Sequence, residues 1–231
     1  MLIALAGCDG AGKTTQIEAL RARLSARGYC VSVLDKWDVL DTERFPECRF
    51  LRPDLGDLKA CIADMEGVSR AMIFFWTLCI TLTKDRLERP DRIYLLDGHW
   101  MKHAAGEIAL GCDPDWVLMT VRQMPRADVT IYLDIPPEDA FARKSSFTLM
   151  ECGRDRTRSR EAFLTHQRRM RERLLAWSDE MGWVKISALQ ATADIEAAID
   201  GVLAARLPPP PSSAALPATR SPGERCPPDV P

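Results

Sequence analysis

The stretch that decides the fold is Gly7-Cys8-Asp9-Gly10-Ala11-Gly12-Lys13-Thr14-Thr15, which fits the pattern G-x-x-x-x-G-K-[ST] in full. It follows the apolar run Leu2 to Ala6 and precedes a helical pattern, so a strand enters the loop and a helix leaves it. Glycines at these places let successive backbone N–H groups point at phosphate oxygens, and the helix adds the positive end of its dipole. The sequence therefore predicts a site for the phosphates of a nucleoside triphosphate.

Individual loop residues have separate roles in such a site. The Lys13 side chain is long enough to reach the β- and γ-phosphates, and the Thr14 hydroxyl can hold a magnesium ion. The other expected phosphate contacts come from Gly7, Gly10, Ala11, Gly12 and Thr15. The alternative is a lipoprotein signal peptide, because Leu5-Ala6-Gly7-Cys8 is similar to a lipidation site. We reject it, since no basic segment precedes the apolar run and the run is shorter than the roughly 7–15 residues that such peptides need.

The composition narrows the class of protein. The chain has 231 residues, enough for one large domain or two small ones, and its formal net charge is −2. This charge provides no basic field, so nucleic acid is not expected as a partner. No apolar run approaches the roughly 20 residues that span a bilayer, so no membrane contact is expected. The eight cysteines are scattered without any C-x-x-C, which indicates buried reduced thiols in a cytoplasmic protein.

Further strands and helices alternate along the chain. Short apolar or β-branched runs predict strands at 29–34, 93–96, 129–133 and 183–187. Residues 55–87 predict two helices broken near Gly67, and the second is expected to be buried because it is apolar on most sides from Met72 to Trp76. The alternation predicts an α/β fold in which helices flank both faces of a parallel sheet.

Charged residues follow several of these strands. Asp97 directly ends the run 93–96, where an acid can hold magnesium or its water; the alternative is that it caps a helix. Lys36 follows the strand 29–34, at the edge where ligands meet a parallel sheet. A later arginine-dense stretch could close over phosphates; it contains Arg143, Lys144, Arg154, Arg156, Arg158 and Arg160.

The end of the chain changes in composition. A helix from Thr192 closes the pattern, and we expect one domain over residues 1–206. Residues 207–231 are rich in proline and cannot bury enough apolar surface to offset their ordering entropy. This segment is predicted to be a disordered tail.

Together these features resemble the thymidylate kinase family over about residues 1–206. The specific marks are Asp9 to Gln16, the stretch Ala127 to Asp134 with Pro137, Glu138 and Arg143, and the region from Arg154 to Phe163. This combination is more specific than a phosphate loop alone, which unrelated proteins share. The resemblance implies a P-loop kinase fold with an arginine-rich lid at about residues 144–160.

The resemblance also implies roles for individual residues. Asp9 would contact the sugar hydroxyl of the acceptor, and Phe74 would stack on its base. Asp97 matches the acid of the family's D-R-[YFH] motif, while Arg143 and Arg154 would clamp the donor phosphates. ATP and Mg²⁺ are the implied donor and metal, a small molecule with dTMP as the nominal case is the acceptor, and a homodimer is left open.

Two positions depart from the family pattern. Gly98 stands where the family has an arginine after its acid, and Leu78 stands where it has an arginine four residues after its stacking aromatic. Both arginines normally hold the phosphate of the acceptor, and a charge-assisted bond contributes about 1.5–3 kcal/mol. Either other cations replace them or the acceptor has no phosphate, and a non-catalytic NTP-binding module is a further alternative. The candidate replacements are Lys36, Arg70, His99, Lys102 and His103.

Overall fold

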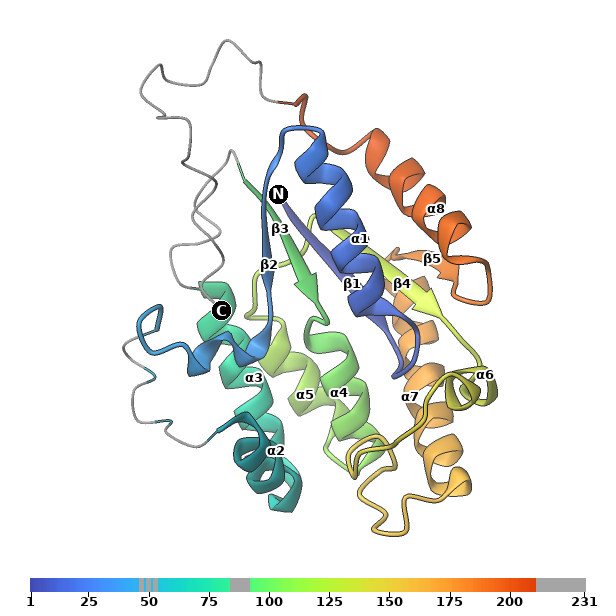
Figure 1. The fold of residues 1–231 in the computed structure, drawn as a ribbon. Helices are drawn as coiled ribbons and strands as arrows, with labels where there is room; N and C mark the ends of the chain where they lie inside the picture. Colours follow the sequence, from blue (N-terminus) through green and yellow to red (C-terminus); the bar gives the residue numbers. More distant parts are fainter. Residues whose placement is uncertain (46–47, 49–50, 52–53, 84–91, 211–231) are drawn as a thin grey trace.

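The computed structural model describes residues 1–45, 48, 51, 54–83 and 92–210 (Figure 1). Its centre is a five-stranded, all-parallel sheet in the order β2-β3-β1-β4-β5. The strands are β1 (Leu2–Gly7), β2 (Cys30–Leu34), β3 (Arg92–Asp97), β4 (Val129–Asp134) and β5 (Val184–Ser187). The predicted parallel α/β fold is confirmed.

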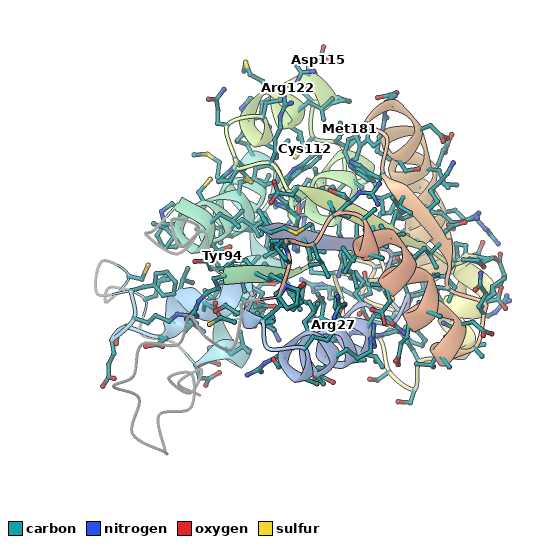
Figure 2. The ribbon with its side chains drawn as sticks, turned by 90° about the horizontal axis from the view of Figure 1, so that it is seen from above. Arg27, Tyr94, Cys112, Asp115, Arg122 and Met181 are labelled. Carbon is teal, nitrogen blue, oxygen red and sulfur yellow. The ribbon has the colours of Figure 1, made fainter. Side chains whose placement is uncertain are left out.

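Helices cover both faces of this sheet. Helices α1 and α8 lie on one face, and α4, α5 and α7 lie on the other, as the view from above in Figure 2 shows. The bounds are α1 (Lys13–Ala26), the 3-10 helix η1 (Lys36–Leu40), α2 (Leu55–Asp64), α3 (Gly67–Thr83), α4 (Trp100–Ala109), α5 (Pro114–Val121), α6 (Pro137–Ala142), α7 (Arg160–Glu180) and α8 (Thr192–Ala204).

The central strand positions the site. All six residues of β1 are buried, because β1 pairs with β3 on one side and β4 on the other and helices cover both of its faces. The register places Leu5 beside Asp97 and Gly7 beside Leu133. The carboxyl ends of these three strands therefore meet at one edge, where ligands bind in sheets of this kind.

Most predicted elements are found close to their expected places. The break near Gly67 separates α2 from α3, and the apolar face of α7 is buried at Phe163, Met170, Leu174 and Trp177. The expectation that α3 is buried on most sides is wrong at Met72, which is 56% exposed.

The cysteine prediction is partly confirmed. All seven described cysteines are free thiols, and four of them are buried: Cys8, Cys48, Cys112 and Cys152. Cys61 on α2 is exposed, so the expectation of burial is wrong there. None of the helices within the described ranges is long and apolar enough to cross a membrane.

The two remaining predicted segments are the lid and the proline-rich tail. Residues 143–159 join α6 to α7 without helix or strand. The predicted lid, at about residues 144–160, lies in this stretch except for Arg160, which begins α7. Of the proline-rich tail, residues 211–231 lie outside the described residues. Just before them, the Tyr29 hydroxyl donates a hydrogen bond of 2.6 Å to the carbonyl oxygen of Pro208.

Candidate active site

The phosphate loop connects β1 to α1, and its shape depends on glycines. Gly10 and Gly12 both have a φ of +83°, in the left-handed region that glycine tolerates best. A Cβ atom at Gly10 would also lie 3.0 Å from the carbonyl oxygen of Ala140 in α6. Gly12 is the N-cap of α1, so the free N–H groups of that helix open toward the loop.

Two oxygen ligands meet beside this loop. The Thr14 hydroxyl donates a 2.6 Å hydrogen bond to the Asp97 carboxylate at the end of β3. The alternative reading of Asp97 as a helix cap is wrong, because the N-cap of α4 is His99. No group of three or more acidic, histidine or cysteine side chains in the described part of the chain could hold a metal ion. The hydroxyl and the carboxylate nevertheless suit Mg²⁺, which binds through one or two carboxylates together with substrate phosphates.

Two pockets meet at the carboxyl edge of the sheet. The first, of about 390 Å³, lies along the loop and is lined by Asp9, Gly10 and residues 12–15 together with Asp35, Asp97, Gly98 and Lys144. The predicted phosphate contacts Gly7 and Ala11 are buried and do not line it. The second, of about 740 Å³, extends away from it between η1, α2, α3, α4 and the segment 146–151. Four residues line both pockets: Asp9, Lys36, Lys102 and His103. We call these four residues the throat.

Asp9 is held from two sides. Its carboxylate forms an ion pair with Lys102 of α4 and accepts a 3.4 Å hydrogen bond from the Gln167 amide of α7. The same amide group accepts from the Asp9 backbone N–H at 3.3 Å and donates to the carbonyl oxygen of Glu151 at 2.9 Å. Burial opposes ionisation of Asp9, but the ammonium groups of Lys102 and Lys13 outweigh it and lower its pKa to about 2. Asp9 is therefore a carboxylate at neutral pH.

The other throat residues have shifted pKa values. Burial lowers the pKa of Lys36 to about 8, although the nearby Asp35 carboxylate partly opposes this. Burial and the neighbouring lysines lower the pKa of His103 well below its usual value, so its imidazole is neutral at pH 7. The ring of His103 stacks on Phe74 with centroids 4.7 Å apart. One wall of the larger pocket therefore combines a flat aromatic surface with cations.

The Lys13 ammonium is directed at the loop itself. Its Nζ donates a 2.9 Å hydrogen bond to the carbonyl oxygen of Cys8. Burial and the proximity of Lys102 lower its pKa. A phosphate in the loop would stabilise the charged form of this ammonium, because it adds negative charge beside it.

Arg70 is not available to an acceptor. Its guanidinium forms a forked ion pair with Glu107 of α4 at 2.8–3.1 Å and donates to the carbonyl oxygen of Met65. Both side chains of the pair are 2% exposed. The pair joins α3 to α4. Glu107 lines the larger pocket and Arg70 does not, which excludes Arg70 as a replacement cation.

His99 also has a role within the fold. It is buried, its Nδ1 accepts a 2.8 Å hydrogen bond from the backbone N–H of Trp100, and its Nε2 lies 3.1 Å from the carbonyl oxygen of Pro125. It lines neither of the two pockets. The expectation that His99 contacts the acceptor is therefore corrected, because both ring nitrogens are used to hold the start of α4.

The predicted lid arginines, Arg143 and Arg154, bond to carbonyl oxygens away from the phosphate loop. Arg143 donates a 2.7 Å hydrogen bond to the carbonyl oxygen of Ala188, and Arg154 donates to that of Ala63 at 3.2 Å. Neither lines the pocket along the loop, whereas Lys144 does. Arg158 lines the larger pocket.

The sequence prediction missed Gln167. This residue lies between Phe163 and Met170 on the buried face of α7 and has no exposed surface. A polar residue within an apolar helical stripe must find hydrogen-bond partners in the interior. That pattern is the signal that could have identified it.

Comparison with curated proteins agrees with this geometry. The chain is 27% identical to the probable thymidylate kinase of Methanosphaera stadtmanae over 168 residues, which cover 71% of this chain and 82% of that protein. It is 28% identical to the probable thymidylate kinase 1 of Saccharolobus solfataricus, covering 71% of this chain and 81% of the relative. The chain is related to the thymidylate kinases. This relationship confirms the predicted resemblance and the predicted class of enzyme, a phosphotransferase.

A third thymidylate kinase relative is bacterial. The thymidylate kinase of Chlorobium phaeobacteroides is 29% identical over 148 residues, which cover 63% of this chain and 66% of that protein. No family model matches the chain.

Proposed function

We propose that the protein transfers a phosphoryl group from ATP to a nucleoside monophosphate in a Mg²⁺-dependent reaction, with dTMP to dTDP as the nominal case. The observation that carries this proposal is the throat, through which a phosphate-loop pocket opens into a second pocket with aromatic and cationic walls. Donor and acceptor phosphates must meet at such a junction for transfer to occur. The names of the relatives support the same reaction.

On the donor side, the loop N–H groups and Lys13 would bind the β- and γ-phosphates. Bound Mg²⁺ would neutralise charge on the transferring phosphoryl group. Thr14 and Asp97 would hold the ion, and their 2.6 Å contact shows that both oxygens reach one place. Because the transfer needs positioning and charge neutralisation more than covalent chemistry, these few groups suffice.

On the acceptor side, we infer that Lys36 and Lys102 replace the two family arginines. Both ammonium groups lie in the throat, on η1 and α4 respectively. Phe74, stacked on His103, offers a flat surface for the base, and Asp9 offers its carboxylate to a sugar hydroxyl. A phosphate oxygen attacks without losing a proton, so the low pKa of Asp9 suits this reaction and would suit a general base poorly.

For the lid, we propose that Arg143 and Arg154 release the carbonyl oxygens that they bond in this structure and bind the donor phosphates instead. Support comes from the lack of regular structure between α6 and α7, since a loop can move without breaking a helix. Lys144 already lies beside the phosphate loop.

We also propose that residues 1–206 form the kinase domain and that the protein works in the reducing cytoplasm, as its free thiols suggest.

A second candidate is transfer to a free hydroxyl of a nucleoside or another small metabolite. Three observations favour it: Gly98 has a φ of +77°, which disfavours a side chain there, Leu78 is fully buried, and Arg70 is held by Glu107.

Measurement of ADP formation separates these candidates. The protein is mixed with ATP and Mg²⁺ and then with dTMP, thymidine or a metabolite panel, and the Lys13→Ala variant serves as the background. The proposal predicts rapid turnover with dTMP and little with thymidine. Turnover of thymidine or a metabolite without dTMP turnover would support the second candidate. ATP binding that depends on Lys13, without transfer to any acceptor, would identify a non-catalytic binding module.

A further inference from the structure

A third cavity opens at the opposite edge of the sheet. It has a volume of about 480 Å³, within the range of small-molecule sites, and lies where β4 and β5 begin. Its floor is apolar and buried at Met101, Val121, Met124 and Val129. Figure 2 views this edge from above, with labels on Arg122, which directly follows α5, and on Met181, which directly follows α7. We call this cavity the distal cleft.

The rim of the distal cleft is cationic. Arg122, Arg126 and Arg206 line it, against the single carboxylate of Asp128. The Asp128 carboxylate already accepts a 2.6 Å hydrogen bond from the backbone N–H of Leu2. Within the described ranges, no ion pair is found for the guanidinium of Arg122 or of Arg126. Planar guanidinium groups with free N–H donors bind carboxylates, phosphates and sulfonates in forked geometry.

Aromatic rings supply the second recognition element. Trp100 and Trp183 both line the distal cleft, and their rings meet edge to face with centroids 6.3 Å apart. Partly exposed indole rings beside an apolar floor favour a flat apolar body. The cleft therefore combines surfaces for an aromatic ring with cations for an anionic group.

The distal cleft and the throat share one turn of helix. Trp100 and Met101, the first residues of α4, line the distal cleft, whereas the next two residues, Lys102 and His103, line the throat. Lys102 holds Asp9 of the phosphate loop. A ligand that moves this turn would therefore change the position of Lys102 and its ion pair.

We propose that the distal cleft binds an aromatic anion and that its occupancy changes acceptor binding through the first turn of α4. The ligand class is a planar apolar ring system that carries a carboxylate, phosphate or sulfonate. Binding itself is independent of the proposed kinase reaction, while the effect on the acceptor depends on it.

The test of binding uses the aromatic sulfonate dye 8-anilinonaphthalene-1-sulfonate, whose fluorescence rises in apolar sites. We expect saturable binding of one dye to the wild-type protein. The double variant Arg122→Glu/Arg126→Glu reverses the rim charge at exposed positions, and its dye affinity should fall about tenfold or more. The matched control Arg169→Glu/Arg173→Glu reverses two charges on another groove, between α4 and α7, and should bind like the wild type.

A second control separates the distal cleft from the substrate pockets. Dye binding should be retained in Lys102→Ala, because Lys102 does not line the distal cleft. Equal dye affinity in the wild type and the rim variant would overturn the proposal. Loss of binding in Lys102→Ala with retention in the rim variant would also overturn it, since the dye would then occupy the throat.

The coupling is measured with the acceptor that the wild-type protein phosphorylates. Saturating dye should change the KM for that acceptor severalfold in the wild type and leave it unchanged in the rim variant. Displacement of the dye by dTTP would identify nucleotides as the source of the anion, and displacement by an aromatic carboxylate alone would identify a non-nucleotide ligand. The same KM change in both proteins would contradict coupling through the distal cleft.

Discussion

The donor and acceptor halves of the site are built in different ways. The proposed donor half uses one continuous stretch of sequence, from which Asp9, Gly10 and residues 12–15 line the pocket. In our proposal its backbone N–H groups and the side chains of Lys13 and Thr14 do most of the binding. The acceptor half takes its lining from η1, α2, α3, α4, α7 and the segment 146–151, and binding there depends on side chains. A site built from backbone N–H groups requires particular residues, such as glycines, at fixed places in the sequence. A site built from side chains can exchange an arginine on one element for a lysine on another.

The largest expected effect lies in the donor half. Lys13→Ala removes the ammonium that we propose binds the donor phosphates and should lower kcat/KM by roughly 10²–10³-fold, since it deletes charge stabilisation in a partly dry site. Steady-state ADP formation measures this loss. Lys185→Ala removes an exposed lysine paired with Asp179 and is the control that should keep wild-type kinetics. A Lys13→Ala enzyme within about twofold of the wild type would contradict the donor assignment.

The next effect concerns the wall of the acceptor half. Arg70→Ala leaves the Glu107 carboxylate buried without its partner, so the free energy of unfolding should fall by about 3–5 kcal/mol. Urea denaturation followed by circular dichroism measures it. The double variant Arg70→Met/Glu107→Leu should recover much of the loss, because it leaves no buried charge. A single variant as stable as the wild type would show that the pair does not hold α3 to α4.

Gln167 links the two halves, and its replacement should have a smaller effect. Gln167→Leu keeps the side-chain volume but removes the hydrogen bonds to Asp9 and Glu151. Losing these bonds should cost about 1–3 kcal/mol, seen as a higher acceptor KM with ATP affinity nearly unchanged. Glu172→Leu, at an exposed position of the same helix, is the control. A KM increase for ATP alone would contradict this positioning role.

Acceptor binding should depend on pH above about pH 8. Lys36 has a pKa of about 8 and is charged below that pH, so its attraction for an acceptor phosphate is present at pH 7 and is lost as the pH rises through 8. Acceptor KM should therefore rise by up to about tenfold per pH unit above 8. Lys36→Arg should move this rise to higher pH. A KM that stays flat from pH 7 to 9.5 in the wild type would show that Lys36 does not bind the phosphate.

Much of the fold and the donor half could be predicted from the sequence because their signals are local. The glycines of the loop, the apolar runs of β1, β3 and β4, and the break at Gly67 each lie within a few residues of the feature they determine. The acceptor half depends on contacts between distant residues. Neither the pairing of Arg70 with Glu107 nor the ion pair between Lys102 and Asp9 can be read from spacing, since each joins separate elements.

The two histidines of α4 show the same limit. His99 and His103 are four residues apart and were both candidates for the acceptor site. The structure uses His99 as the N-cap of α4 and places His103 in the throat. Histidine can cap a helix or contact a ligand, and the sequence alone does not distinguish these two roles.

The central claim is that lysines of the throat hold the acceptor phosphate. Its most direct test compares Lys102→Ala with Lys59→Ala, which removes a lysine from the larger pocket outside the throat. The KM for dTMP should rise about tenfold or more in Lys102→Ala, with the KM for ATP within about twofold of the wild type, while Lys59→Ala leaves both nearly unchanged. Equal dTMP KM values in the two variants, in a protein whose wild type phosphorylates dTMP, would contradict the claim.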